Sequence, residues 1–540
     1  MGLYHHYQFF VFGLLCLLLL CVTVWIKKEF SIYTGKYCLL SVLFLSTALL
    51  SLIMAPDRGE AFEGVLRIIV VLVFVILLMQ FDREPRDILK FLPESAAVMV
   101  LISSLGYLSG GIRDFLFYKD RMGGFFQYPN TFAFFLLLSL MLLIFYGEGK
   151  KRGIRQGCYV ILLGGIFLSG SRMVFVLFLV SFPGLFFVER GKKKSLLIGS
   201  AVLGLFLAVL CLLGKASLFT RVFQISLTDT YVLERMLFWK DSIPCIAKYP
   251  LGSGYGGYYI LQGLFQTGAY STRHVHNEWL QTALDYGIVP ALILVLLTVS
   301  CLTEKQQDAK TKMLMALYAF RFCFDIDQRY GCMLLFFAAL IPAKTGKRKT
   351  VQISGTALKG FFLAGGIYAA FLLWTGGANA LLVSGREPLS YRLYPACMEA
   401  AEMTLAKADD YAAYCPMAEK VLQKNPYCVT AWRVVAYAAF EEGDFETMSN
   451  ALEQRVNLEK YKKSAYQDYI QMHYAATRIC MNDGDTSRAA ALAKKGARVA
   501  DLRQQALDRI SELAKKCKDA PKLKLSKQDR EAIEYLKQVE

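Results

Sequence analysis

Two histidines stand close together in the segment His274-Val275-His276-Asn277-Glu278, directly before a strongly apolar stretch. They are two of only five histidines in the chain. An imidazole titrates near neutral pH, so one of these rings could remove a proton from an attacking hydroxyl group. Two alternatives stay open. His-x-His on an extended segment can bind zinc, although no cysteine or third histidine accompanies it, and a histidine beside Asn277 can belong to a helix cap.

A second candidate is the turn Ser169-Gly170-Ser171-Arg172, which joins two apolar stretches. The turn is so short that Arg172 must lie at a membrane edge or inside a helix bundle, where an arginine needs an anionic partner. A guanidinium binds phosphate oxygens through two parallel hydrogen bonds, and no acidic residue stands nearby in sequence. The turn therefore predicts an anion site at Arg172, with snorkelling to a lipid phosphate as the alternative.

Two further arginines have polar or aromatic neighbours. Arg121 precedes Pro129 and Asn130, which suit the first turn of a helix, so we expect its side chain in external water or in a cavity at headgroup level. Anchoring of that helix at the interface is the alternative for Arg121. Arg235 and Trp239 stand four residues apart and share one face of a predicted amphipathic helix.

The elements that position these residues are predicted to be membrane helices. The chain has 540 residues, of which 55% are hydrophobic, whereas the apolar fraction of a soluble protein normally stays below half. Runs of about 20 apolar residues separated by short charged stretches indicate transmembrane helices. We predict an all-α fold, with about twelve spans in a membrane bundle at residues 1–378. The predicted spans are about 8–26, 37–54, 61–81, 89–108, 127–146, 156–170, 172–189, 195–214, 278–302, 312–328, 330–343 and 355–377.

The formal net charge of +17 is explained by topology. Basic residues gather in short loops between spans, a distribution that marks the cytoplasmic side, so nucleic acid is not needed as a partner. They are Lys27, Lys28 and Lys36; Lys150, Lys151, Arg152 and Arg155; Arg190, Lys192, Lys193 and Lys194; and Lys344, Lys347, Arg348 and Lys349. With these loops inside, both termini are external, and so are the candidate residues and a long loop at about 215–277.

Residues 385–540 differ in character, with mixed charge and a helical pattern rich in alanine and tyrosine. The stretch around Gly443-Asp444 aligns with the stretch around Gly484-Asp485, and small residues follow each pair at spacings typical of crossing helices. This pattern resembles tetratricopeptide hairpins, which offer concave surfaces to protein partners. We predict a soluble, external, tetratricopeptide-like domain, with an ordinary helical bundle as the alternative.

Five motifs occur together and in one order. They are R-x-x-G-x-F-x-x-P-N from Arg121, S-R ending at Arg172, R-x-x-x-W from Arg235, P-L-G-x-G from Pro250, and H-x-H-N-x-x-L-Q from His274. In this order the chain resembles the O-antigen ligase and polymerase superfamily over about residues 121–290. The resemblance implies a metal-independent, inverting glycosyltransferase without a cofactor, whose donor is a glycan linked to undecaprenyl diphosphate.

The same resemblance assigns roles to the candidate residues. It implies that His276 activates the acceptor hydroxyl, with His274 as a second candidate, and that Arg172 and Arg235 hold the donor diphosphate. The remaining residues expected to bind substrate are Arg121, Asn130, Asn277 and Trp239. The chain departs from related proteins after Arg321, where Asp325 and Asp327 stand without the expected histidine, so the roles of Arg321 and Asp325 stay open.

The resemblance also implies a location in a bacterial cytoplasmic membrane, among its lipids, with a glycan, lipid or cell-wall component as acceptor. The motifs do not decide between a ligase and a polymerase. Two other classes remain as alternatives: a polysaccharide flippase or transporter, and an envelope scaffold that acts through the C-terminal helices. The clustering of arginines and histidines in external segments favours the enzyme, because a transporter places its functional polar groups near the middle of the bilayer.

Overall fold

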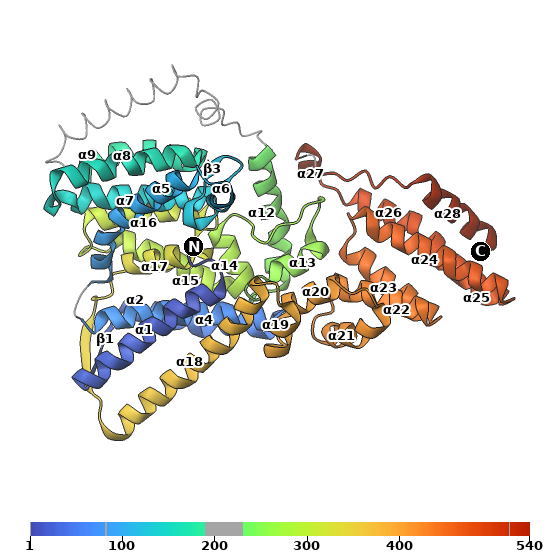
Figure 1. Ribbon diagram of the computed structural model, residues 1–540, viewed down its shortest axis with the longest axis horizontal. Coiled ribbons are helices and arrows are strands. Elements are labelled where there is room, and N and C mark those ends of the chain that lie inside the picture. The colour runs from blue at the N-terminus through green and yellow to red at the C-terminus, as the bar shows by residue number, and fades with distance from the viewer. Residues whose placement is uncertain (1, 82–83, 189–229, 518) are drawn as a thin grey trace, which may run out of the picture.

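The computed structural model describes residues 2–81, 84–188, 230–517 and 519–540 (Figure 1). This part of the chain is almost entirely helical, as predicted, with two small antiparallel sheets, β1–β4 and β2–β3. The predicted span at 195–214 and the beginning of the predicted external loop lie outside the described residues.

The elements up to residue 383 are as follows, with short 3-10 helices labelled η. They are α1 (His6–Lys27), β1 (Glu29–Thr34), α2 (Lys36–Ala48), α3 (Ser51–Met54), α4 (Arg58–Met79), η1 (Pro85–Phe91), α5 (Leu92–Gly106), α6 (Gly110–Leu116), β2 (Phe117–Tyr118), β3 (Arg121–Met122), η2 (Gly124–Phe126), α7 (Pro129–Tyr146), η3 (Gly147–Gly149), α8 (Arg152–Ser169), α9 (Arg172–Val188), α12 (Thr230–Lys248), α13 (Gly257–Phe265), α14 (Glu278–Tyr286), α15 (Ile288–Thr303), α16 (Ala309–Phe322), η5 (Asp327–Arg329), α17 (Gly331–Leu340), β4 (Lys347–Gln352) and α18 (Gly355–Val383).

Within the described residues, six helical segments are long and apolar enough to cross a membrane. They are 6–27, 36–54, 58–79, 85–106, 129–149 and 355–383, each of which overlaps a predicted span. Three shorter apolar helices begin at Arg172, Ile288 and Gly331. The central helix α7 is almost entirely buried among other helices, whereas α18 is exposed along most of its length and has the surface of a helix that faces lipid. The total of twelve spans stays a prediction.

The predicted span at 278–302 is divided into α14 and α15 at Gly287, whose φ is +106°. The glycine-rich stretch before α13 packs against this break. A Cβ placed on Gly252 would lie 2.6 Å from the carbonyl carbon of Tyr286, so only glycine allows the two backbones to come so close. The predicted span at 312–328 corresponds to α16, which ends at Phe322. Residues 323–330 therefore form a connection between α16 and α17, outside both helices.

The two ends of the bundle differ (Figure 1). At one end, β1 follows the basic pair Lys27-Lys28 and pairs with β4, which carries Lys347, Arg348 and Lys349. At the other end lie β3, α12 and α13, and the C-terminal helices extend away from this end. The strongly basic sheet and the candidate site are therefore at opposite ends of the bundle.

The C-terminal helices form antiparallel pairs around their own apolar core. They are α19 (Glu387–Leu393), α20 (Met398–Ala406), α21 (Tyr411–Lys424), α22 (Val429–Glu441), α23 (Phe445–Leu458), α24 (Lys463–Asn482), α25 (Thr486–Ala497), α26 (Val499–Asp508), α27 (Glu512–Lys516) and α28 (Lys527–Val539). The two predicted Gly-Asp turns connect α22 to α23 and α24 to α25. In each turn the glycine has a positive φ, and Asp444 or Asp485 caps the following helix.

Candidate functional site

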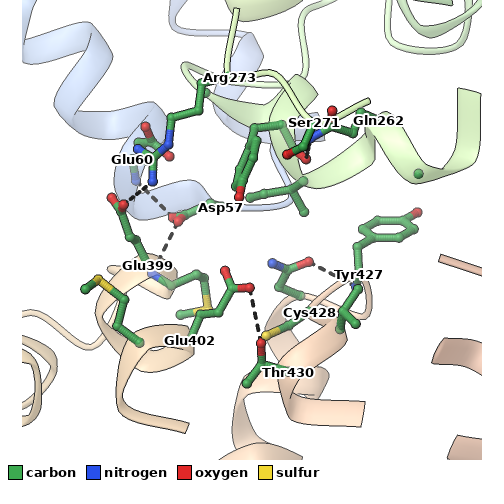
Figure 2. A pocket seen from close by; sticks show the side chains of 18 of the residues that line it. Asp57, Glu60, Gln262, Ser271, Arg273, Glu399, Glu402, Tyr427, Cys428 and Thr430 are labelled. Carbon is green, nitrogen blue, oxygen red and sulfur yellow. Dashed lines mark hydrogen bonds and ion pairs between the residues drawn. The ribbon is translucent and has the colours of Figure 1, made fainter. Parts of the chain in front are cut away.

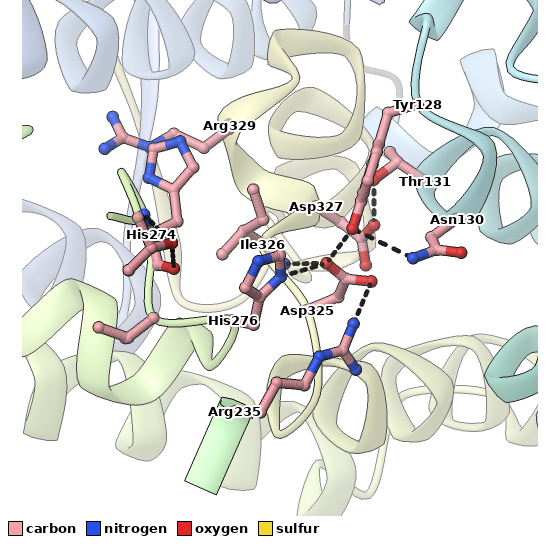
Figure 3. A network of polar contacts seen from close by, with 12 residues as sticks. Tyr128, Asn130, Thr131, Arg235, His274, His276, Asp325, Ile326, Asp327 and Arg329 are labelled. Carbon is pink, nitrogen blue, oxygen red and sulfur yellow. Dashed lines mark hydrogen bonds and ion pairs between the residues drawn. The ribbon is translucent and has the colours of Figure 1, made fainter. Parts of the chain in front are cut away.

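The candidate site surrounds Asp325, a fully buried residue in the connection between α16 and α17 (Figure 3). Its Oδ1 accepts a hydrogen bond from the Tyr128 hydroxyl at 3.1 Å and lies 3.2 Å from Nδ1 of His276. Its Oδ2 accepts from Arg321 at 2.6 Å and lies 3.7 Å from the Arg235 guanidinium. Side chains from four separate segments of the chain thus meet at one carboxylate.

These neighbours decide the charge of Asp325. Burial alone would raise the pKa of its carboxyl group. The charge of Arg321, the hydrogen bond from His276 and the charge of Arg235 outweigh burial and hold the pKa of Asp325 well below its ordinary value. Asp327 also bonds Arg321, at 2.7 Å, yet burial prevails there and raises the pKa of Asp327. The carboxylate with the lowered pKa is the one that faces His276.

The orientation of His276 follows from this contact. An ionised carboxylate only accepts hydrogen bonds, so the proton of the neutral imidazole belongs on Nδ1, facing Asp325. Nε2, on the other side of the ring, then keeps its lone pair and can accept a proton from a hydroxyl group. Asp325 would stabilise the imidazolium that this transfer creates. The His276 side chain is 24% exposed, so a substrate can reach it.

The backbone at His276 is strained, with φ +52°, a region that residues with a Cβ rarely adopt. Such strain persists where the surrounding structure fixes it, and it concentrates at functional sites. Asn277, the next residue, holds the backbone of His276 in this conformation. Its Oδ1 caps α14 by accepting from the Leu280 N–H at 3.1 Å, and its Nδ2 donates to the Cys323 carbonyl at 3.2 Å. The predicted cap at Asn277 is therefore present, and it also ties His276 to the connection that carries Asp325.

Helix α12 holds the same loop from the other side. Trp239 donates from Nε1 to the Val275 carbonyl at 2.8 Å, and Arg235, one turn earlier, reaches Asp325. The four-residue spacing predicted that these two side chains share one helix face, and both contact the site from that face.

Arg121 joins the network through Asn130. It donates to Asn130 Oδ1 at 2.7 Å, and Asn130 donates to the Tyr128 hydroxyl at 3.1 Å, which in turn bonds the central carboxylate. Arg121 also donates from Nε to the Ser169 carbonyl at 2.8 Å, so it fixes the turn between α8 and α9. Arg172 follows that carbonyl by three residues, as the first residue of α9, and is partly buried.

His274 has a different environment from its neighbour His276. Nδ1 of His274 accepts a hydrogen bond from Arg329 at 3.2 Å. Burial, then the positive charge of Arg329, hold the pKa of His274 well below its ordinary value. Arg329 itself lies 3.7 Å from Asp285 and 3.6 Å from the centre of the Tyr255 ring. A histidine that remains neutral beside a guanidinium is suited to positioning the loop more than to carrying a proton.

Sequence reasoning did not identify Tyr128 and left Asp325 and Arg321 without a role. Tyr128 stands inside the R-x-x-G-x-F-x-x-P-N motif, directly before Pro129, but nothing in the motif indicates that its hydroxyl group takes part in the site. Asp325 is 49 residues from His276 in the sequence, and only the packing of α14 against the α16–α17 connection brings the two together. The available signal was the charged series Arg321, Asp325 and Asp327, which begins in the last turn of α16 and continues just after it.

Comparison with known proteins bears on the central part of this chain. Residues 157–295 match the model of the O-antigen ligase family, a range that includes Arg172, Arg235, His276 and Asn277 and ends before Asp325. No curated protein and no solved structure matches the chain. Together with the long apolar helices, the family match supports an integral membrane enzyme of the glycosyltransferase type in O-antigen or polysaccharide processing. Its central segment is similar to O-antigen ligases, whose substrates are lipid-linked glycans and glycan acceptors.

Proposed function

We propose that this protein is a glycosyltransferase of the O-antigen ligase or polymerase type, which moves a glycan from undecaprenyl diphosphate to an acceptor hydroxyl on the external face of a bacterial cytoplasmic membrane. The observation that carries the proposal is the contact between His276 and the buried, ionised Asp325, beside Arg235. This arrangement pairs a base with a cation able to bind phosphate, which are the two groups that the reaction needs.

In the proposed reaction, Nε2 of His276 takes the proton of the acceptor hydroxyl. The hydroxyl oxygen attacks the anomeric carbon of the donor from the side opposite the diphosphate, and the configuration at that carbon inverts. The bond between the anomeric carbon and the phosphate oxygen breaks, and the lipid diphosphate leaves with the electron pair. Arg172 and Arg235 stabilise the negative charge that develops on it, as fixed guanidinium groups can do without a metal.

The sidedness rests on the two ends of the bundle. The sheet of β1 and β4 is strongly basic, and basic residues concentrate on the cytoplasmic side of membrane proteins. The candidate site and the C-terminal helices lie at the opposite end (Figure 1). We therefore propose that the reaction and the C-terminal helices lie outside the cell. The proposal also includes twelve membrane spans and a tetratricopeptide-like C-terminal domain that binds protein partners.

The test is transfer by the full-length protein in vesicles, with a lipid-diphosphate-linked glycan as donor. We expect His276→Ala to lower transfer by about 10²–10⁴-fold, because general base catalysis supplies an effect of that size. Arg172→Ala should lower transfer by about 10²–10³-fold, the cost of removing one fixed donor to a developing charge. Arg392→Ala, at an exposed arginine of α19, is the matched control and should transfer normally. Full transfer by either site variant, with normal membrane insertion, would refute the assignment.

A further inference from the structure

A cavity of about 1060 Å³ lies beside the candidate site, between the membrane part and the C-terminal helices. Figure 2 shows its two walls. Asp57 and Glu60, at the start of α4, and the loop residue Arg273 face Glu399 and Glu402 of α20. An ion pair between Arg273 and Glu399 ties the walls together, and the first backbone N–H of α20 donates to Asp57 at 3.2 Å. The cavity thus exists only because the C-terminal helices cover the bundle at this point.

The lining of the cavity does not suit the donor diphosphate. Among the described residues that line it, carboxylates outnumber lysines and arginines. The arginines assigned to the diphosphate, Arg172 and Arg235, are not among these lining residues, and neither is Arg121. Each of the three cations in the lining already has a carboxylate partner: Arg273 pairs with Glu399, Arg329 with Asp285 and Lys462 with Glu459. The described lining therefore offers no unpaired cation to hold phosphate or an acidic sugar.

The same lining suits hydroxyl groups and the flat faces of sugar rings. The lining contains carboxylates, amides and tyrosines, among them Glu402, Asn425, Gln262, Tyr259 and Tyr427. Carboxylate and amide groups accept and donate the hydrogen bonds that neighbouring hydroxyls offer, and tyrosine has an apolar ring with a polar end. Burial raises the pKa of Glu402, whose carboxylate accepts from the Thr430 hydroxyl at 3.3 Å, so this wall is less negative than its composition suggests.

Two lining residues have buried polar atoms without a partner among the described residues. They are the hydroxyl of Tyr461, a residue only 7% exposed, and Nε2 of His274. A buried polar group without a hydrogen bond costs free energy, which a bound ligand with several hydroxyls could recover. The volume also exceeds the range of about 300–1,000 Å³ that is usual for small-molecule pockets, so there is room for several sugars in a chain.

The cavity reaches the segment that carries the proposed catalytic histidine. His274 and Arg329 line it, and His276 is only two residues beyond His274. In Figure 3 the ring of His276 lies between His274 and Asp325. Because Nδ1 faces Asp325, the proton-accepting Nε2 lies on the other side of the His276 ring.

We propose that this cavity binds the acceptor as a chain of several uncharged sugars whose terminal hydroxyl reaches His276. The assignment rests on the proposed function and deepens it. The donor diphosphate lies on the side of Asp325 that carries Arg235, and the acceptor lies on the side of the cavity. The C-terminal helices then form half of the acceptor site.

The test separates binding from transfer. Binding is measured on full-length His276→Ala in nanodiscs, with three fluorescent probes of matched length: a neutral oligosaccharide cut from the host's surface polysaccharide, an oligouronate and a lysine-rich peptide. We expect saturable binding of the neutral probe and at least tenfold weaker binding of the oligouronate and the peptide. Glu402→Ala and Glu60→Ala should each weaken binding of the neutral probe by about tenfold, the effect of losing the hydrogen bonds of one buried polar side chain. Arg392→Ala, outside the cavity, is the control.

Tighter binding of the peptide or of the oligouronate would overturn the assignment, as would binding of the neutral probe that neither cavity variant weakens. Transfer by variants that retain His276 then separates the two proposals. A raised KM for acceptor in Glu402→Ala, with turnover recovered at high acceptor concentration, supports the cavity. A normal KM refutes the cavity while leaving the glycosyltransferase intact. Cavity binding in a protein that transfers no glycan would count against the proposed function alone.

Discussion

Two charged centres lie four residues apart in the connection between α16 and α17, and each has a histidine. At the first, the carboxylate of Asp325 is surrounded by donors and cations and faces His276. At the second, the guanidinium of Arg329 donates to His274. The first centre places a carboxylate beside its imidazole, and the second places a guanidinium there. His276 is therefore suited to proton transfer at the first centre, and His274, two residues earlier, is suited to structural support at the second.

The largest expected effect comes from neutralising the first centre. Asp325→Asn removes the charge that fixes the Nδ1 proton and stabilises the imidazolium, and we expect transfer to fall by about 10²–10⁴-fold. The measurement is kcat/KM for transfer in vesicles. Asp327→Asn is the matched control, because Asp327 shares Arg321 but contacts Thr131 in place of His276. An equal loss in both variants would show that Arg321, and not the pairing with His276, matters.

The same substitution alters stability in a pH-dependent way. The pKa of Asp325 is lower in the folded protein than the ordinary value of about 3.9, so its stabilising effect is complete above that value and is lost as pH falls through the folded pKa. Asp325→Asn should therefore melt at a lower temperature than the unaltered protein at pH 7, and the gap should narrow below pH 4. A gap that is constant with pH would contradict the ionised state of Asp325.

The sequence predicted the helical class and the longest spans, because uninterrupted apolar stretches such as those in α4 and α7 leave few alternatives. It did not predict the break at Gly287, where the polar residues of α14, such as Glu278 and Asp285, give way to the apolar α15. The sequence predicted the motif residues Arg121, Asn130, Arg235 and His276 as candidates. In the structure they are connected through Tyr128 and Asp325. Asp325 could not be assigned, because its role comes from a buried contact across 49 residues of chain.

The next expected effect concerns the cation beside the first centre. Arg235→Ala should lower kcat by about 10²–10³-fold, because it removes a fixed positive charge from the departing diphosphate. Arg235→Lys should recover part of this loss, since lysine keeps the charge but not the planar fork that binds two phosphate oxygens. The check is turnover at saturating donor. If both variants raise KM and leave kcat unchanged, Arg235 holds the donor without acting on the transition state.

The smallest expected effect comes from the second centre. In His274→Gln, the side-chain oxygen can still accept the hydrogen bond from Arg329, so we expect transfer to change by less than about tenfold. A loss as deep as that of His276→Ala would assign the base to His274 and reverse the comparison. Single-turnover rates of the two variants, at one donor concentration, make the measurement direct.

Under the proposed function, the ion pair between Arg273 and Glu399 has a consequence for how the choice of acceptor could change. One wall of the cavity belongs to α4 and to the loop that also carries the histidines, and the other belongs to α20 and the C-terminal helices beside it. Exchange of those terminal helices between related chains would replace one wall and leave the bond-forming residues untouched. Recombination at a single junction near the end of α18 could then change the acceptor specificity and leave the donor site unchanged.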